Sequence, residues 1–136
     1  MDLGYSIVSF LAWLVTGLLK FLINSLQSKK LAFDLIGYGG LPSNHSAIVS
    51  SIVSLIGFRE GFNHPTFGLA ITLAFIVIMD AGSLRSQVGK HAIKINQISK
   101  RKKNYLPLRE RIGHSRIEIL TGVVVGVMVG WSVSLF

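Results

Sequence analysis

Apolar positions along this chain fall into four long blocks separated by short polar stretches. The blocks cover residues 3–26, 46–58, 66–79 and 117–136. The first and last are long enough to cross ~30 Å of hydrocarbon as helices. The two middle blocks are shorter than the ~18 residues usually needed, so they cross only if their small polar flanks also lie within the membrane. The pattern predicts an all-α, polytopic integral membrane helix bundle with about four membrane helices, two of them short, in a single domain over residues 1–136.

Composition supports a membrane location. Half of the residues are hydrophobic, only 15% are charged, and the mean hydropathy is +0.56, whereas a soluble domain carries about 25% charged residues. Ten of the 14 basic residues lie between positions 85 and 116, including the run KRKK at 100–103. We expect a basic loop with some helix here, facing the cytoplasm by the positive-inside rule and contacting membrane lipids. No aromatic residues interleave with the basic run, so nucleic-acid binding is not expected.

The stretch LPSNHSA at 41–47 places an imidazole at the start of an apolar block. Pro42 can open a helix, whose free N–H groups attract an anion, and His45 there can donate a proton to a leaving group. Alternatively, Ser43 or Asn44 simply caps the helix and His45 faces headgroups.

Two further motifs carry ionisable groups on the same side of the expected topology. In GHSRIE at 113–118, His114 and Glu118 are four residues apart, so on a helix they share one face and the carboxylate can orient the imidazole. The alternative is an interfacial pair in which Glu118 favours the helix dipole. In DAGSLRS at 80–86, Asp80 either pairs with Arg85 or supports it as a phosphate ligand.

Two other features allow both a structural and a functional interpretation. Lys20, the charged residue inside the first block, either extends its ammonium to the membrane surface or points inward as a phosphate ligand. The glycines at spacing four in the last block, Gly122, Gly126 and Gly130, allow helices to approach closely. They predict helix packing, within the chain or in a homo-oligomer through the last helix.

The motifs GGLPSNHSA, DAGSLRSQVGKHAIKIN and GHSRIEILTGVVVG together resemble the divergent type-2 phosphatidic acid phosphatase family, also described as acid phosphatase/vanadium-dependent haloperoxidase-related membrane proteins. The resemblance covers nearly the whole chain. It implies that His114 is the nucleophile, that Glu118 orients it and that His45 is the general acid. It further implies phosphate binding by basic and polar groups, for which the candidates are Ser43, Asn44, Arg85, Lys20, Arg109 and Arg111, with Asp80 in support.

The resemblance and the residues lead to three hypotheses. The first is a membrane phosphatase that hydrolyses a lipid phosphate or diphosphate at the cytoplasmic leaflet through a phosphohistidine, with no cofactor and no metal. The second is a non-catalytic protein that binds lipid phosphates or assists a partner, because the basic motifs of the larger lipid phosphatases are missing. The third is a metal-dependent or transport protein that uses the histidines as ligands or proton relays.

Overall fold

The structure is a computed structural model that describes residues 3–29, 31, 40–102 and 104–136. Most of the polar connection expected between residues 27 and 40, and Lys103 of the basic run, lie outside the described residues. Every regular element within the described ranges is helical: α1 (Gly4–Ser28), α2 (Asn44–Arg59), α3 (Pro65–Met79), the π-helical turn η2 (Asp80–Leu84), α4 (Arg85–Ser99) and α5 (Arg116–Ser134). The all-α prediction is confirmed.

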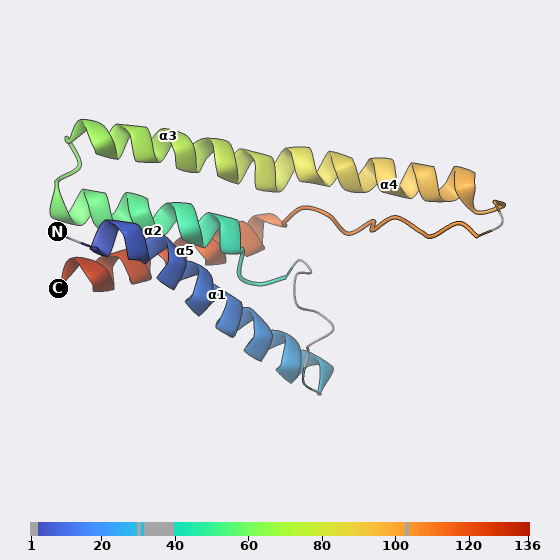
Figure 1. The fold of residues 1–136 in the computed structure, drawn as a ribbon, viewed down its shortest axis with the longest axis horizontal. Helices are drawn as coiled ribbons and strands as arrows, with labels where there is room; N and C mark the ends of the chain where they lie inside the picture. The colour runs from blue at the N-terminus through green and yellow to red at the C-terminus, as the bar shows by residue number, and fades with distance from the viewer. Residues whose placement is uncertain (1–2, 30, 32–39, 103) are drawn as a thin grey trace.

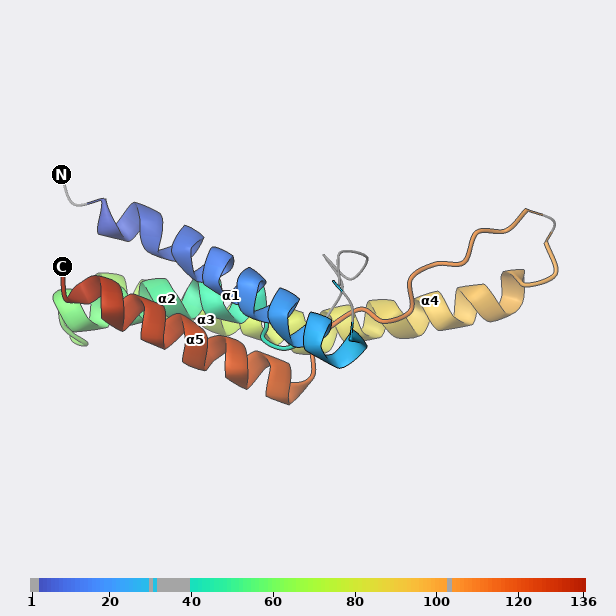
Figure 2. The ribbon, with the colours of Figure 1, turned by 90° about the horizontal axis from the view of Figure 1, so that it is seen from below.

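Helix α2 is the centre of the bundle. It packs against α1, α3 and α5, while α3, η2 and α4 follow one another as a single long rod (Figure 1). Both described chain ends lie at the end of the bundle where α2 turns into α3 (Figure 1). The rod continues past the other helices at the opposite end, and residues 104–113 return alongside α4 (Figures 1 and 2).

Small residues bring α2 and α5 into close contact. Gly122, Gly126 and Gly130 are buried in α5, and a Cβ added at each would lie 2.3–2.4 Å from a backbone oxygen of α2 or of its N-cap Ser43. The glycine stripe is therefore filled by α2 of the same chain. Any contact between copies through α5 would have to use another face of that helix.

Side-chain caps fix where the helices begin. Ser43 caps α2 by accepting the Ser46 N–H, which agrees with the capping interpretation of this motif, and α2 begins two residues after Pro42. Pro65 occupies the first turn of α3, where its missing N–H needs no partner. Ser115 and Glu118 form a reciprocal capping box at the start of α5. Each cap satisfies N–H groups that the first turn of a helix leaves without intrahelical partners.

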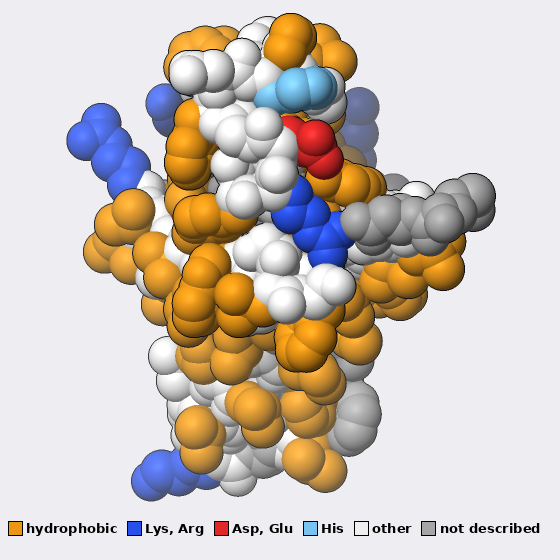
Figure 3. Space-filling model, turned by 90° about the vertical axis from the view of Figure 1, so that its left-hand side faces the viewer, with side chains coloured by type: hydrophobic (Ala, Val, Ile, Leu, Met, Phe, Trp, Pro, Cys, Tyr) orange, Lys and Arg blue, Asp and Glu red, His pale blue; other side chains and the backbone are white. Residues whose placement is uncertain are grey.

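Three helical stretches are long and apolar enough to cross a membrane: Gly4–Ser28, Pro65–Ser99 and Arg116–Ser134. Large hydrophobic side chains on them are exposed, among them Phe10, Leu69, Phe75, Leu120 and Trp131. Figure 3 shows hydrophobic side chains over much of the surface seen from the end that holds the chain termini. Soluble proteins rarely expose so much apolar surface to water, so these side chains mark the lipid-facing sides of the bundle.

The middle blocks differ from one another. Helix α2 has 16 residues, so the prediction of a short helix holds for the second block. The third block is not short, because its helix does not end at Asp80: η2 carries it directly into α4, giving 35 consecutive helical residues. No proline interrupts residues 80–99, and Gly82 lies within η2 without the positive φ of a helix-terminating glycine.

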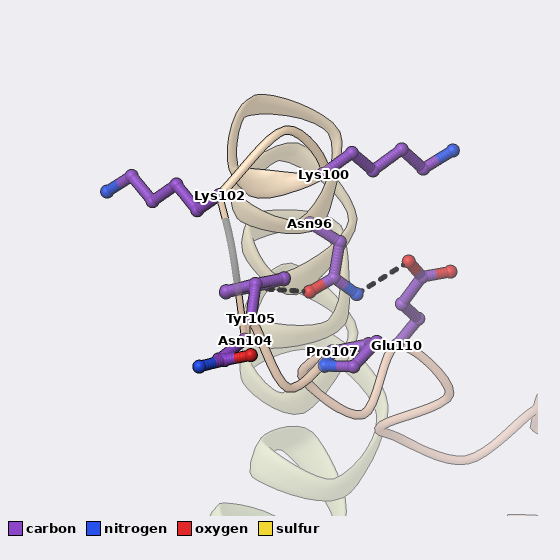
Figure 4. A pocket seen from close by; sticks show the side chains of 7 residues that line it. All are labelled: Asn96, Lys100, Lys102, Asn104, Tyr105, Pro107 and Glu110. Carbon is purple, nitrogen blue, oxygen red and sulfur yellow. Dashed lines mark hydrogen bonds between the residues drawn. The ribbon is translucent and has the colours of Figure 1, made fainter.

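The basic region is a hairpin of α4 and the returning segment, held by Asn96. The Asn96 amide donates to the Leu108 carbonyl (2.8 Å) and to Glu110 Oε1 (2.7 Å), and its carbonyl accepts from the Leu108 N–H (2.8 Å) and Tyr105 Oη (2.7 Å). These bonds line a hollow of about 320 Å³ in which the ammonium groups of Lys100 and Lys102 point away from each other (Figure 4). The hollow is therefore a joint of the hairpin rather than a convergent anion site.

Candidate active site

The two histidines singled out by the sequence lie together in the structure. The ring centroids of His45, at the start of α2, and His114, just before α5, are 5.8 Å apart with their planes at 72°. Both rings are half-buried, and the Nδ1 atom of each is buried without a hydrogen-bond partner among the described residues. Buried polar nitrogens normally find a partner. These two are therefore free to act on a bound group.

Hydrogen bonds of the N-cap residue Ser43 fix the start of α2, where His45 lies. Ser43 is fully buried, its N–H donates to the Glu118 carbonyl (2.9 Å), and its hydroxyl accepts from Ser46 Oγ (3.1 Å). These bonds tie the start of α2 to the first turn of α5. Asn44 Oδ1 is also buried and has no hydrogen-bond partner among the described residues. Asn44, the residue before His45, thus adds a third uncommitted polar atom among the described residues.

His114 lies in a backbone segment that packs closely on the rod. Its N–H donates to the carbonyl of Ala81 in η2 (3.0 Å). Gly113 before it has φ +100°, and a Cβ there would lie 2.9 Å from the Ser86 nitrogen. Gly89 approaches the returning segment in the same way, since a Cβ on it would lie 2.6 Å from the Glu110 oxygen. The glycines of two motifs are therefore sites of backbone contact that a side chain would prevent.

The expectation that His114 and Glu118 share a helix face is wrong. His114 precedes Ser115, the N-cap of α5, so it is outside the helix. Glu118 is only 8% exposed. Its side chain turns back to the cap, where Oε2 accepts from the Ser115 N–H at 2.7 Å. Its Oε1 lies 3.7 Å from an Arg111 nitrogen. The capping box satisfies a free N–H of the first turn, which is why the helix starts after the histidine.

Positive groups surround the histidine pair. Arg85 Nε donates to Asp80 Oδ2 at 2.9 Å, which is the pairing that the sequence suggested. Lys20 of α1 is partly buried, and its ammonium interacts electrostatically with Glu118 and with both imidazoles. Lys20 therefore points toward the cluster rather than to the far membrane surface.

The two remaining candidate cations make other contacts. Arg111 is 78% exposed at its side chain, and one of its nitrogens lies 3.7 Å from Glu118 Oε1. Arg109 is exposed, and its Nε donates to the Arg111 carbonyl at 3.1 Å. Neither is brought to the imidazoles by a contact within the described residues.

The protonation of His114 is set mainly by burial. Burial lowers its pKa below the ordinary value of 6.5; nearby Glu118 opposes this shift, while Lys20, His45 and Arg85 add to it. His114 is therefore neutral near pH 7, and a neutral imidazole has a nitrogen lone pair available to attack or to accept a proton. Within the described ranges, no group of three or more histidine, aspartate or glutamate side chains is arranged to hold a metal ion.

Sequence reasoning missed the backbone part of the site. The Ala81 carbonyl, the π-helical turn that contains it and the close approach of Gly113 to Ser86 were not predicted. The spacing of five residues between Asp80 and Arg85 was the available signal, since it suits a π-turn better than an α-helix.

Comparison with known proteins identifies the family of the chain. A sequence model described as the Divergent PAP2 family matches residues 4–129. The "Uncharacterized membrane protein YuiD" of Bacillus subtilis (strain 168) is 26% identical over 143 residues, which cover 92% of this chain and 90% of that protein. No solved structure matches the chain. The family match spans all the residues of the histidine cluster, and the chain is therefore a membrane protein of the Divergent PAP2 family.

Proposed function

We propose that this protein is an integral membrane phosphatase that hydrolyses a lipid phosphate or diphosphate. The observation that carries the proposal is the pairing of His45 and His114 at 5.8 Å, each with a buried and uncommitted Nδ1. Arg85 and Lys20 supply positive charge beside the pair. Phosphoryl transfer needs such parts: a nucleophile, a proton donor and cations that stabilise charge on the phosphoryl oxygens.

The reaction follows from opposite protonation states of the two rings. Neutral His114 attacks phosphorus through a ring nitrogen, so that an N–P bond forms while the P–O bond to the leaving group breaks. Protonated His45 gives its proton to the leaving oxygen. Water then attacks the phosphohistidine with His45 as base, which releases inorganic phosphate and restores both rings. Burial lowers the pKa of His114 and keeps that ring neutral; it lowers the pKa of His45 as well, so the negative charge of the bound phosphate has to hold the proton on His45.

Glu118 has a role through space rather than through a hydrogen bond to the nucleophile. Its carboxylate favours positive charge on His114, which develops when the ring nitrogen bonds to phosphorus. Its capping box also fixes the start of α5, immediately after the nucleophile. Losing the carboxylate would therefore disturb both charge and position.

The place of the cluster favours a substrate anchored in lipid. The histidines lie at the ends of α2 and α5, beside helices whose hydrophobic side chains are exposed. A headgroup could reach the cations there while its acyl chains remain in the bilayer. The cluster is at the same end of the bundle as the basic hairpin (Figures 1 and 2). The positive-inside rule then assigns the site to the cytoplasmic leaflet.

The test is release of inorganic phosphate from a panel of lipid monophosphates and diphosphates in nanodiscs. We compare wild type with His114→Ala and His45→Ala, and use His91→Ala on the exposed side of α4 as the matched control. We expect each cluster variant to lose at least ~10³-fold in kcat/KM, and the control to be unchanged, with or without chelator. Full activity in either cluster variant with retained folding would refute the mechanism.

A non-catalytic lipid phosphate-binding protein is the second candidate. The observation that favours it is the position of the Glu118 carboxylate, which is bound to Ser115 N–H and lies near Arg111 rather than on the nucleophile. This protein would bind lipid phosphate in competition with inorganic phosphate and release none. Measuring binding and release on the same nanodisc sample separates the two functions.

A further inference from the structure

The rod contains a π-helical turn at the level of the histidine pair. Residues Asp80–Leu84 form η2, and the Arg85 N–H donates to the Asp80 carbonyl five residues before it. Single π-turns within α-helices are rare and occur frequently at functional sites. Two groups of the cluster are attached to this turn.

The first attached group is Arg85. In an α-helix, residues five apart differ by about 140° around the axis, so their side chains would diverge. The π-turn brings Asp80 and Arg85 to one side, where Oδ2 accepts from Nε at 2.9 Å. Among the described residues, this is the hydrogen bond that the Arg85 guanidinium makes. The bond fixes the guanidinium plane through Nε and leaves the two terminal nitrogens to bind an anion.

The second attached group is His114. The buried Ala81, 1% exposed, offers its carbonyl to the His114 N–H at 3.0 Å. A backbone carbonyl inside a helix normally accepts from the helix itself, but this one accepts from a segment outside it. Close approach of Gly113 to Ser86 completes this contact just beyond the turn. The nucleophile is thus attached through its backbone to the turn that aligns the arginine.

We propose that η2 is a positioning element that sets Arg85 and His114 relative to one another, with Asp80 acting on Arg85 and the Ala81 carbonyl acting on His114. This inference rests on the proposed phosphatase function. It assigns the π-turn a purpose that a plain α-helical connection would not serve. Removing one residue would rotate α4 by about 100° and shift it by about 1.5 Å relative to α3. Asp80, Arg85 and Ala81 would then no longer face the cluster together.

The experiment compares deletion of Ser83 with Ser83→Ala. Ser83 is exposed, and its hydroxyl donates to the Met79 carbonyl one turn earlier, so the substitution keeps the turn while the deletion removes its extra residue. We measure phosphate release and hydrogen exchange of the His114 amide. In the deletion variant, we expect at least ~100-fold loss of kcat/KM and roughly tenfold or faster exchange; the substitution should change neither. A folded deletion variant with full activity and a protected amide would overturn the proposal.

If the deletion variant fails to fold, the substitution Asp80→Asn provides a second test of the proposal. Weakening the charge-assisted bond to Arg85 should raise KM about tenfold, with kcat within about twofold and His114 exchange unchanged. A purely structural role would instead lower Tm and leave KM unaltered, and that result overturns the assignment of Asp80. Hydrogen exchange needs no turnover. If wild type released no phosphate, protection of the His114 amide and its loss on deletion would still test the turn separately from the phosphatase activity.

Discussion

His45 and His114 meet edge to face, with ring centroids 5.8 Å apart, although their motifs lie far apart in the sequence. The contact exists because α2 packs directly on α5, and Ser43 at the start of α2 bonds to the Glu118 carbonyl in the first turn of α5. Each ring thus lies next to an anchored helix start.

The pair should behave as one unit in turnover. If His114 attacks and His45 donates the proton, removing either prevents the same step, so the second removal costs little more. We expect the kcat/KM of the double variant His45→Ala/His114→Ala to lie within about tenfold of either single variant. Multiplicative losses would show that the two rings act independently.

Activity should persist at mildly acid pH. Because burial lowers the pKa of His114, the folded protein keeps this ring neutral below pH 6.5, where an ordinary histidine is protonated. The acid limb of the kcat/KM profile that reports the nucleophile should therefore lie below pH 6.5. An acid limb above that value would contradict the assignment.

The same lowered pKa makes a prediction for stability. Above pH 6.5 the ring is neutral in both the folded and the unfolded protein, so it contributes no pH dependence. As the pH falls below 6.5, the unfolded protein takes up the proton first, so stability decreases until the folded pKa is passed. In His114→Asn this part of the decrease in Tm should disappear, with His91→Asn as the control.

The α2–α5 contact should not tolerate a side chain at Gly126. A Cβ there would lie 2.4 Å from the Ala47 oxygen and 2.9 Å from its Cα, and backbone atoms cannot move aside as a side chain can. We expect Gly126→Ala to cost about 1–3 kcal/mol of stability, despite alanine's better helix propensity. Val124→Ala, on the exposed side of α5, is the control in thermal unfolding in detergent. Equal Tm values would argue that the helices are less closely packed.

Asn96 should determine whether the basic hairpin holds together. Asn96→Asp keeps the oxygen that accepts from the Leu108 N–H, but places a carboxylate against the Leu108 carbonyl and Glu110. We expect faster proteolysis and faster hydrogen exchange over residues 104–110, because the repelling oxygens replace two hydrogen bonds. Gln97→Glu adds the same charge at an exposed neighbouring position and should leave both unchanged.

Topology can be tested with single cysteines, because the chain has none of its own. Arg101→Cys lies on the hairpin and Asn63→Cys in the connection between α2 and α3, and both positions are exposed. We expect an impermeant thiol reagent added outside intact cells to label Asn63→Cys, and Arg101→Cys to be labelled only after permeabilisation. The reverse pattern would place the site on the outer leaflet.

The sequence by itself determined the helical membrane architecture and the identity of the charged and histidine side chains in the cluster. The long apolar blocks are local signals, and they specified where α1, α3 and α5 begin to within a few residues. Glycines at spacing four likewise indicated a close helix contact.

Only the tertiary structure decided how these groups meet. Whether Gly126 faces a second copy or α2, and whether His45 reaches His114, depend on which helices pack together, and many packings share one apolar pattern. Glu118 turned to the Ser115 cap instead of His114, because a cap satisfies a free N–H of the first turn. The π-turn likewise arises where α3, α4 and the His114 segment converge, so the propensities of residues 80–84 alone could not specify it.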